Sequence, residues 1–169
     1  ADLVPLAELP PELPIAVLAA EDRRFFRHNG IDVFGVLRAA IRNVHAGRIV
    51  QGGSTITQQL AKNVFLSPER SMRRKFKELL LSLWLEHRFT KDQLLTIYLN
   101  RVYLGGGAEG VEAAARRYFG KSARGLNLAE CAMVAGLLKA PSRYAPTRDL
   151  EKSQARASQV LDSMVDAGH

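Results

Sequence analysis

The sequence contains one cysteine, few aromatic residues and no long hydrophobic run. Cys131 cannot form an internal disulfide, and its place in an apolar run predicts a packed thiol. No window reaches the roughly 18 apolar residues that a membrane span needs. The four histidines have no partners at metal-ligand spacing, so the sequence does not predict a zinc site. Aromatic residues make up 7% of the chain and form no stacking motif of the kind that binds nucleic acid.

The size and charge of the chain predict a folded domain with an anionic partner. We expect a single domain over residues 1–169, because 47% hydrophobic and 24% charged residues are typical of a globular protein. Lys and Arg number 24 against 17 Asp and Glu, a net charge of +7 that favours nucleic acid, an anionic membrane surface or a phosphorylated substrate. Because the chain begins at Ala1 without a methionine, we expect an excised piece of a longer protein.

The hydrophobic pattern predicts an all-α, mainly helical fold. Start and stop signals include Gly30 after the first helix, Asp32 as a cap of the second, and capping boxes at Thr90 with Gln93 and at Asn127 with Glu130. The predicted helices cover about 14–29, 33–46, 55–62, 67–88, 91–104, 109–118, 128–138 and 150–165. The only strands we consider are short pairs near 48–51.

An acidic pair, Glu21 and Asp22, stands where the apolar run 15–20 ends. A carboxylate at the edge of a core is partly desolvated, which moves its pKa toward the range useful for proton transfer. The alternative is that both residues form ordinary surface ion pairs with Arg23, Arg24 or Arg27.

A second polar cluster covers residues 52–63, with hydroxyl and amide side chains around Gly52 and Gly53. Glycines let the backbone approach a ligand, and a helix start rich in Ser and Thr suits an anion or a sugar. Gln59 and Lys62 are three residues apart and should share a face. The alternative is a glycine turn followed by an ordinary polar helix.

A third cluster, residues 70–78, contains five cations within eight positions and ends at Glu78. Periodicity predicts that Arg74, Lys75 and Glu78 form a solvated face, opposite a buried stripe, and that the stretch 79–85 is buried all round. The stripe comprises Met72, Phe76, Leu79, Leu80 and Leu83. Glu78 is the last polar residue before that stretch, so we also consider a buried boundary, where carboxylate and cations suit a phosphate leaving group.

These three clusters, in this order, resemble the first three signatures of the family 51 peptidoglycan glycosyltransferases. These are the polymerising domains of bifunctional penicillin-binding proteins and of monofunctional transglycosylases. The matching segments are Glu-Asp-Arg-Arg-Phe-Phe-x-His-x-Gly-Ile-Asp at 21–32, the whole of 52–63, and Arg-Lys-x-x-Glu at 74–78. Residues 91–105 are similar to the fourth signature, and the resemblance covers about 5–148.

The resemblance implies a lysozyme-like head with a smaller, membrane-associated jaw subdomain. It implies an inverting polymerase that transfers the growing lipid-linked glycan onto the 4-hydroxyl of lipid II and releases a polyprenyl pyrophosphate. Such an enzyme works at the outer (periplasmic or extracytoplasmic) face of the bacterial cytoplasmic membrane. The implied partners are lipid II, the lipid-linked glycan, the membrane through the jaw and an anchor before residue 1, and a fused transpeptidase domain; nucleic acid is not one of them.

The resemblance also assigns roles to individual residues. Glu21 would be the general base for the acceptor hydroxyl, and Glu78 would organise the leaving group or a divalent metal ion, Mg or Mn, whose requirement is left open; no organic cofactor is implied. The cations would hold the pyrophosphate, and the remaining polar residues would position sugars and neighbouring side chains. The substrate-binding set is Asp22, Ser54, Gln59, Lys62, Arg70, Arg74 and Lys75.

Two other classes of function compete with a polymerase. A muramidase or lytic transglycosylase would also use a lysozyme-like head and an acidic residue, but glycan cleavage expels a sugar and needs no cationic clamp. A basic helical module that binds nucleic acid or a membrane surface would not explain the segment 52–63.

Overall fold

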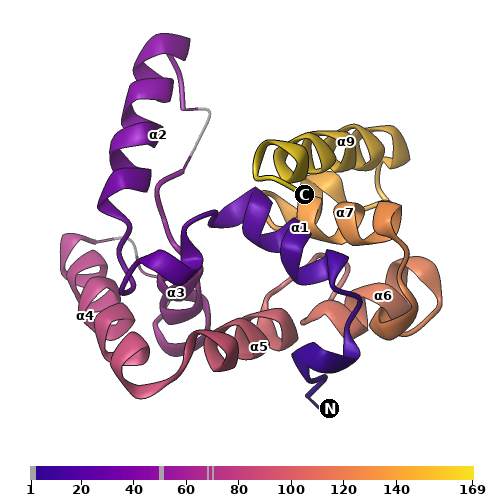
Figure 1. The fold of residues 1–169 in the computed structure, drawn as a ribbon, viewed down its shortest axis with the longest axis horizontal. Helices are drawn as coiled ribbons and strands as arrows, with labels where there is room; N and C mark the ends of the chain where they lie inside the picture. Colours follow the sequence, from indigo (N-terminus) through magenta and orange to yellow (C-terminus); the bar gives the residue numbers. More distant parts are fainter. Residues whose placement is uncertain (1–2, 50–51, 68, 70) are drawn as a thin grey trace. The chain divides into compact units, whose positions relative to one another are not determined.

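The computed structural model describes residues 3–49, 52–67, 69 and 71–169 of the chain. Within these residues the structure is all-α and contains no β-strand beyond an isolated bridge between Tyr103 and Glu109. The predicted fold class is therefore confirmed (Figure 1). The predicted strand pair near 48–51 falls partly on residues 50 and 51, which lie outside the described residues.

The chain divides into two compact units. Unit 1 comprises Ala1–Arg23 and Leu95–His169, and unit 2 comprises Arg24–Leu94. The helices of unit 1 are α1 (Glu12–Glu21), the larger part of α5 (Lys91–Arg101), α6 (Val111–Phe119), α7 (Leu128–Leu137), α8 (Pro141–Tyr144) and α9 (Leu150–Asp166). Those of unit 2 are α2 (Val33–Ala46), α3 (Ile56–Leu60), α4 (Met72–Arg88) and the first turn of α5.

The core of unit 1 forms where α1, α7 and α9 pack side by side (Figure 1). Leu13 and Val17 of α1 are buried against this core together with Val134 of α7 and Val160 of α9. Burial, together with the nearby charges of Glu12 and Glu130, raises the pKa of Cys131 to about 12. The predicted packed thiol is confirmed.

Capping boxes define several helix starts as the sequence predicts. Thr90 and Gln93 exchange both hydrogen bonds before α5, and Asn127 and Glu130 do so before α7. The first helix ends earlier than predicted, at Glu21, and a 3-10 turn η2 (Phe25–Arg27) follows it. Asp32 precedes α2 but makes no side-chain cap bond, because its carboxylate accepts from Arg24 Nε at 3.1 Å.

Glycines between α5 and α6 build a tight turn that no other residue type would fit. Gly105, Gly106, Gly107 and Gly110 all have positive φ. A Cβ on Gly110 would lie 2.4 Å from the carbonyl oxygen of Asn100, and one on Gly105 would lie 2.8 Å from the hydroxyl of Tyr118. Close approach accounts for Gly105 and Gly110, and the positive φ accounts for Gly106 and Gly107.

The orientation predicted for α4 is wrong. Its buried face carries Arg74, Glu78 and Ser82, with Leu85, whereas the apolar side chains predicted to be buried point to solvent. Met72 is 85% exposed and Phe76 is 61% exposed, and Leu80, Leu83 and Trp84 are also exposed. The prediction that 79–85 is buried all round is also wrong. The inward polar groups are tolerated because they are hydrogen-bonded, as in Ser82 Oγ to the carbonyl of Glu78 at 2.7 Å.

Helix α4 also begins later than predicted. Its first residue is Met72 rather than a residue near Ser67, and the cap is Ser71, whose hydroxyl accepts from the backbone N–H of Arg74 at 3.1 Å. Pro68, near the start of the predicted range 67–88, lies outside the described residues.

Candidate functional site

Helix α3 is fixed at its start by a capping box. Thr55 accepts from the backbone N–H of Gln58, and the Gln58 side chain accepts from the backbone N–H of Thr55. The side chains of Ile56 and Leu60, also in α3, are buried in the core. A π-helical turn, η3 (Ala61–Phe65), follows directly and presents Lys62 and Asn63 to solvent. The second sequence cluster is therefore a rigid helix start followed by an exposed polar turn.

The first turn of α4 is held by its own polar groups. The guanidinium of Arg74 is mostly buried and donates through Nη1 to the carbonyl oxygen of Glu69. Lys75 Nζ donates to Glu78 Oε1 at 2.9 Å, and the Glu78 carboxylate is 6% exposed while the Lys75 side chain is 47% exposed. The ammonium group can therefore reach a ligand while the carboxylate keeps it in place.

A pocket of about 750 Å³ lies in unit 2 between these two segments. It is lined by Ser54, Lys62, Asn63, Leu66, Glu69, Ser71, Arg74, Lys75 and Glu78. Two cationic side chains, Lys62 and Lys75, enter it from different segments and remain exposed. The lining combines three cations with two carboxylates, two hydroxyls and an amide. The exposed lysines suit an anionic ligand, and the other polar groups suit sugar hydroxyls.

The acidic pair belongs to unit 1, at the end of α1. Glu21 is the last residue of the helix and is half-buried, and Asp22 follows as its buried C-cap. Burial raises the pKa of Tyr98 well above its usual value, and the charges of Glu21 and Asp22 raise it further. Tyr98 therefore stays a neutral phenol close to two carboxylates.

The arginines that could have paired with this acidic pair also make other bonds. Arg23 Nε donates to the carbonyl of Ala19 at 3.3 Å, and Arg24 forms its ion pair with Asp32.

Five of the predicted site residues line the same pocket, and the others lie elsewhere or outside the described residues. Ser54, Lys62, Arg74, Lys75 and Glu78 line the pocket, although the sequence pattern alone predicted a solvated face for the last three. Gln59 lies in α3 but not in the pocket lining, and Glu21 and Asp22 belong to the other unit. Arg70 lies outside the described residues.

Sequence reasoning missed several polar residues of unit 2. Asn63 and Glu69 line the pocket, and they flank predicted site residues in the sequence. Glu86 and Lys91 form a buried ion pair near His28, a histidine that spacing along the sequence left isolated. The available signal was the four-residue spacing of Arg74, Glu78, Ser82 and Glu86, which places a polar row on one face of α4.

A divalent metal would find few protein ligands in this pocket. Within the described part of the chain, no group of three or more His, Cys, Asp or Glu side chains could hold a metal ion. The pocket offers the carboxylates of Glu78 and Glu69. Magnesium is commonly bound by one or two carboxylates together with substrate phosphates, so Glu78 with ligand oxygens is the arrangement that fits.

The helical fold carries, in unit 2, a pocket whose cationic side chains suit an anionic ligand. The chain belongs to the transglycosylase family, whose sequence pattern matches residues 1–165. It is 49% identical over 166 residues to penicillin-binding protein 1A of Escherichia coli (strain K12), covering 98% of this chain and 20% of the relative. Identity to penicillin-binding protein 1A of Aquifex aeolicus (strain VF5) is 50% over 166 residues, covering 98% and 23%.

A solved structure shares this fold. It is the crystal structure of penicillin-binding protein 1A from Haemophilus influenzae, with a TM-score of 0.56 and 28% sequence identity, covering 98% of this chain and 15% of that chain. The chain thus spans about a fifth of the length of the curated relatives it matches. The predicted family is confirmed; the reading of 1–169 as one domain stays a prediction.

Proposed function

We propose that the chain is an inverting peptidoglycan glycosyltransferase that polymerises lipid II. The observation that carries this proposal is the pocket in which Lys62 and Lys75 converge beside Glu78. Two exposed cations, one of them held by the buried Glu78 carboxylate, suit a pyrophosphate whose negative charge grows as its bond to the sugar breaks. Membership of the transglycosylase family supports the same reaction class.

In this mechanism Glu21 is the general base. Its carboxylate takes the proton from the 4-hydroxyl of the acceptor sugar, and the resulting oxygen nucleophile attacks the anomeric carbon of the growing glycan. The carbon–oxygen bond to the pyrophosphate breaks on the opposite side, so the configuration inverts. The half-buried position of Glu21 at the end of α1, next to the buried Asp22, supports this role.

The pocket residues act on the leaving group. Lys75 and Lys62, with Arg70 from the resemblance, neutralise the departing pyrophosphate, while Glu78 orients Lys75 through their 2.9 Å bond. Ser54, Arg74, Gln59 and Asp22 position sugars and neighbouring side chains. A divalent ion bound by Glu78 would add further positive charge to the leaving group.

A turnover assay with labelled lipid II in detergent tests this proposal. We expect glycan chains of many disaccharide units from the unmodified chain. If it makes none and instead cleaves preformed glycan, the lytic reading holds and the proposal is wrong.

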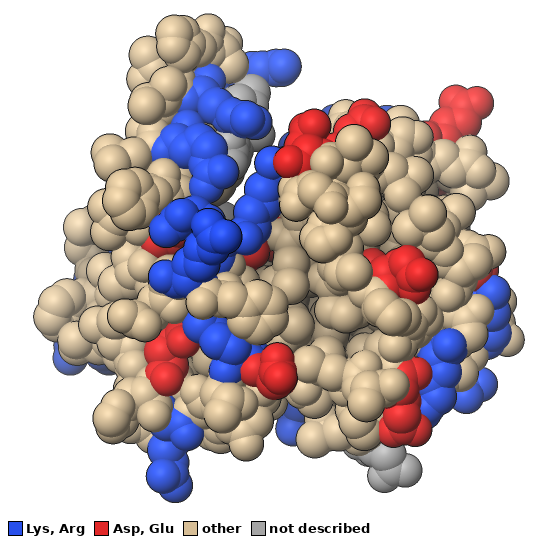
Figure 2. Space-filling view, viewed as in Figure 1, with Lys and Arg blue, Asp and Glu red and all other residues tan. Residues whose placement is uncertain are grey.

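We further propose that unit 2 docks on the outer face of the bacterial cytoplasmic membrane. The apolar side chains of α2 are exposed, among them Leu37 at 55% and Ile41 at 59%, and α4 also turns apolar side chains outward. Figure 2 shows basic side chains along α2, which contains Arg38 and Arg42. Apolar and basic groups on one helix suit insertion among anionic lipid headgroups. No helix in the described part of the chain combines the length and apolar character needed to cross a membrane.

Substituting aspartate at two exposed positions of α2 tests the docking. Leu37→Asp with Ile41→Asp should weaken binding to vesicles of phosphatidylglycerol and phosphatidylethanolamine by about tenfold or more, since each buried apolar side chain contributes roughly 1.5–3 kcal/mol. Vesicle cosedimentation measures this effect. Val165→Asp, at an exposed position of α9 in unit 1, is the matched control. Equal binding by the α2 variant and the control would contradict the proposal.

A further inference from the structure

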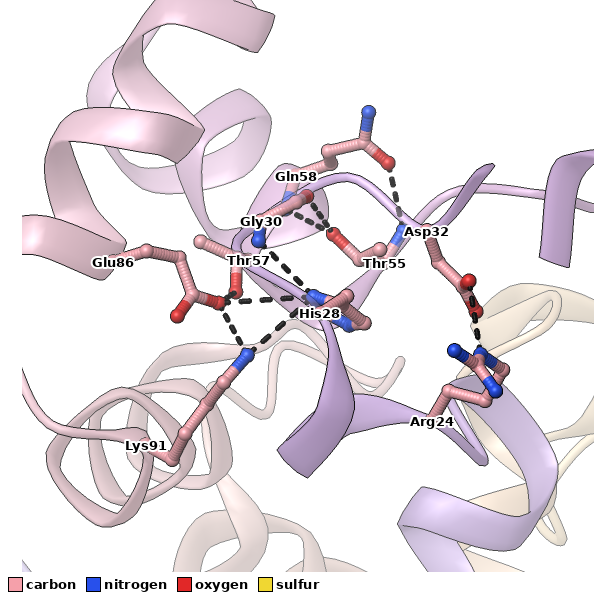
Figure 3. A network of polar contacts seen from close by, with 9 residues as sticks. All are labelled: Arg24, His28, Gly30, Asp32, Thr55, Thr57, Gln58, Glu86 and Lys91. Carbon is pink, nitrogen blue, oxygen red and sulfur yellow. Dashed lines mark hydrogen bonds and ion pairs between the residues drawn. The ribbon is translucent and has the colours of Figure 1, made fainter. Parts of the chain in front are cut away.

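A buried polar network in unit 2 joins four segments of the chain (Figure 3). Its centre is Glu86 of α4, whose side chain is 9% exposed. Glu86 Oε1 accepts from Thr57 Oγ1 of α3 at 2.7 Å and from Lys91 Nζ at the start of α5 at 2.6 Å. A carboxylate with this little exposure needs such donors, because an unpaired buried charge is strongly destabilising.

His28 also takes part in the network. Its Nδ1 accepts from the backbone N–H of Gly30 at 3.0 Å and lies 3.9 Å from Glu86 Oε1. Lys91 Nζ lies 3.4 Å from the same nitrogen and 4.5 Å from the centre of the Phe25 ring. Lys91 places its positive charge within hydrogen-bond distance of the Glu86 carboxylate.

The backbone at Gly30 hydrogen-bonds to the N-cap of α3 and lies in close contact with α4. Its carbonyl oxygen accepts from Thr55 Oγ1 at 2.6 Å. Gly30 has a φ of +108°, and a Cβ there would lie 3.0 Å from the carbonyl oxygen of Ser82 and 3.2 Å from Glu86 Cγ. Only glycine fits this position without strain. The network thus fastens α3 and α4 through direct bonds and through the loop 28–30.

The pocket is lined by the segments on either side of α3, with Ser54 before it and Lys62 after it in η3, and by the first turns of α4. Thr57 lies between Ser54 and Lys62 in the sequence, and Glu86 lies two turns beyond Glu78 on the polar face of α4. The network therefore joins α3 to the end of α4 that carries Glu86, whereas the pocket lies beside the end of α4 that carries Lys75 and Glu78. A shift between the helices would separate Lys62 from Lys75.

We propose that Glu86 is a positioning residue, which holds α3 against α4 so that Lys62 and Lys75 bind the same anionic group. Thr57 and Lys91 act through it. The identity of that group as the pyrophosphate of the donor rests on the proposed function. The positioning itself is a property of unit 2 and can be measured without turnover.

The test separates positioning from stability. Lys91→Met alone leaves the Glu86 charge buried without its partner and should lower the melting temperature. The double variant Glu86→Gln with Lys91→Met removes both charges and should recover most of the melting temperature. We expect it nevertheless to bind inorganic pyrophosphate about tenfold more weakly than the unmodified chain, by calorimetry well below the melting temperature. Thr57→Val should weaken binding in the same direction.

A non-additivity experiment and a matched control complete the test. Lys75→Ala should weaken pyrophosphate binding strongly in the unmodified chain and much less in the double variant. The reason is that Lys62 and Lys75 no longer bind the same group in the double variant. Glu112→Gln is the control: this unit 1 carboxylate accepts from Ser122 and Ala123 and does not line the pocket. It should leave binding unchanged.

The outcomes distinguish this proposal from the proposed function. Full recovery of both melting temperature and pyrophosphate binding in the double variant would show that the network only stabilises the fold, and would overturn the proposal. Glycan synthesis without measurable pyrophosphate binding would overturn it while the proposed function stands. Pyrophosphate binding without glycan synthesis would contradict the proposed function, and the variants would still decide the positioning role.

Discussion

Glu21→Gln is expected to lower the rate of glycan synthesis by about a hundredfold or more. The amide has almost the size of the carboxylate but cannot take up a proton, and general-base catalysis is typically worth about 10²–10⁴ in rate. The loss should appear in kcat rather than in KM, since the proton is transferred only in the transition state. Polymerisation of labelled lipid II at saturating concentration measures it.

Glu12→Gln is the matched control for this variant. Glu12 is the first residue of the same helix and is exposed, so the same chemical change occurs without touching the acidic pair. Both variants should retain near-normal melting temperatures. A Glu21→Gln variant that polymerises as fast as the control would remove Glu21 from the mechanism.

Lys75→Met is expected to reduce kcat/KM for lipid II by about a hundredfold. The ammonium group lies in the pocket, paired with Glu78 at 2.9 Å, and would face the pyrophosphate as its charge grows. Removing one preorganised charge-stabilising group from an active site typically costs about 10²–10³ in rate. Glu78→Gln should also lower the rate, because the amide no longer forms the ion pair that holds the Lys75 side chain in place.

Lys77→Met provides the comparison. Lys77 is exposed on the same helix and does not line the pocket, so its removal changes the net charge equally without touching the leaving group. We expect nearly normal turnover from it. Equal losses in both variants would mean that general electrostatic attraction, rather than the pocket, explains the effect of Lys75.

The helices could be predicted because their end signals are local. Thr90 with Gln93 and Asn127 with Glu130 form the capping boxes that the sequence indicates, and the bonds involve only residues three apart. Such short-range chemistry is fully written in the sequence. Helix α1 ends before the stop signal at Gly30, because the backbone leaves the helix at Asp22 and a separate 3-10 turn follows at 25–27.

The orientation of α4 could not be predicted from periodicity. The spacing of apolar residues along a helix identifies an apolar and a polar face. The rule that the apolar face points inward assumes that the outward face of the helix contacts water. Here the polar row of Arg74, Glu78 and Ser82 is inward because each makes internal hydrogen bonds. The resemblance of Lys75 and Glu78 to a known signature was a better guide to the pocket than the pattern was.

The network around Glu86 could not be predicted because, apart from the bonds of Glu86 with Lys91 and of His28 with Gly30, its bonds are long-range. Thr57 and Glu86 are 29 residues apart, and Lys91 and His28 are 63 apart. The sequence shows Glu86 as the end of a polar row on α4, but it does not show that Thr57 or His28 lies next to it. Only the packing of α3 on α4 brings them together.

The stoichiometry of lipid pyrophosphate release tests the central claim most directly. Unmodified chain should be given labelled lipid II, and both the glycosidic bonds formed and the polyprenyl pyrophosphate released should be counted over time. The account predicts one pyrophosphate lipid for each new bond, with glycan length growing throughout. Shortening of preformed glycan with no pyrophosphate lipid released would contradict it, because the cationic pocket would then have no leaving group to stabilise.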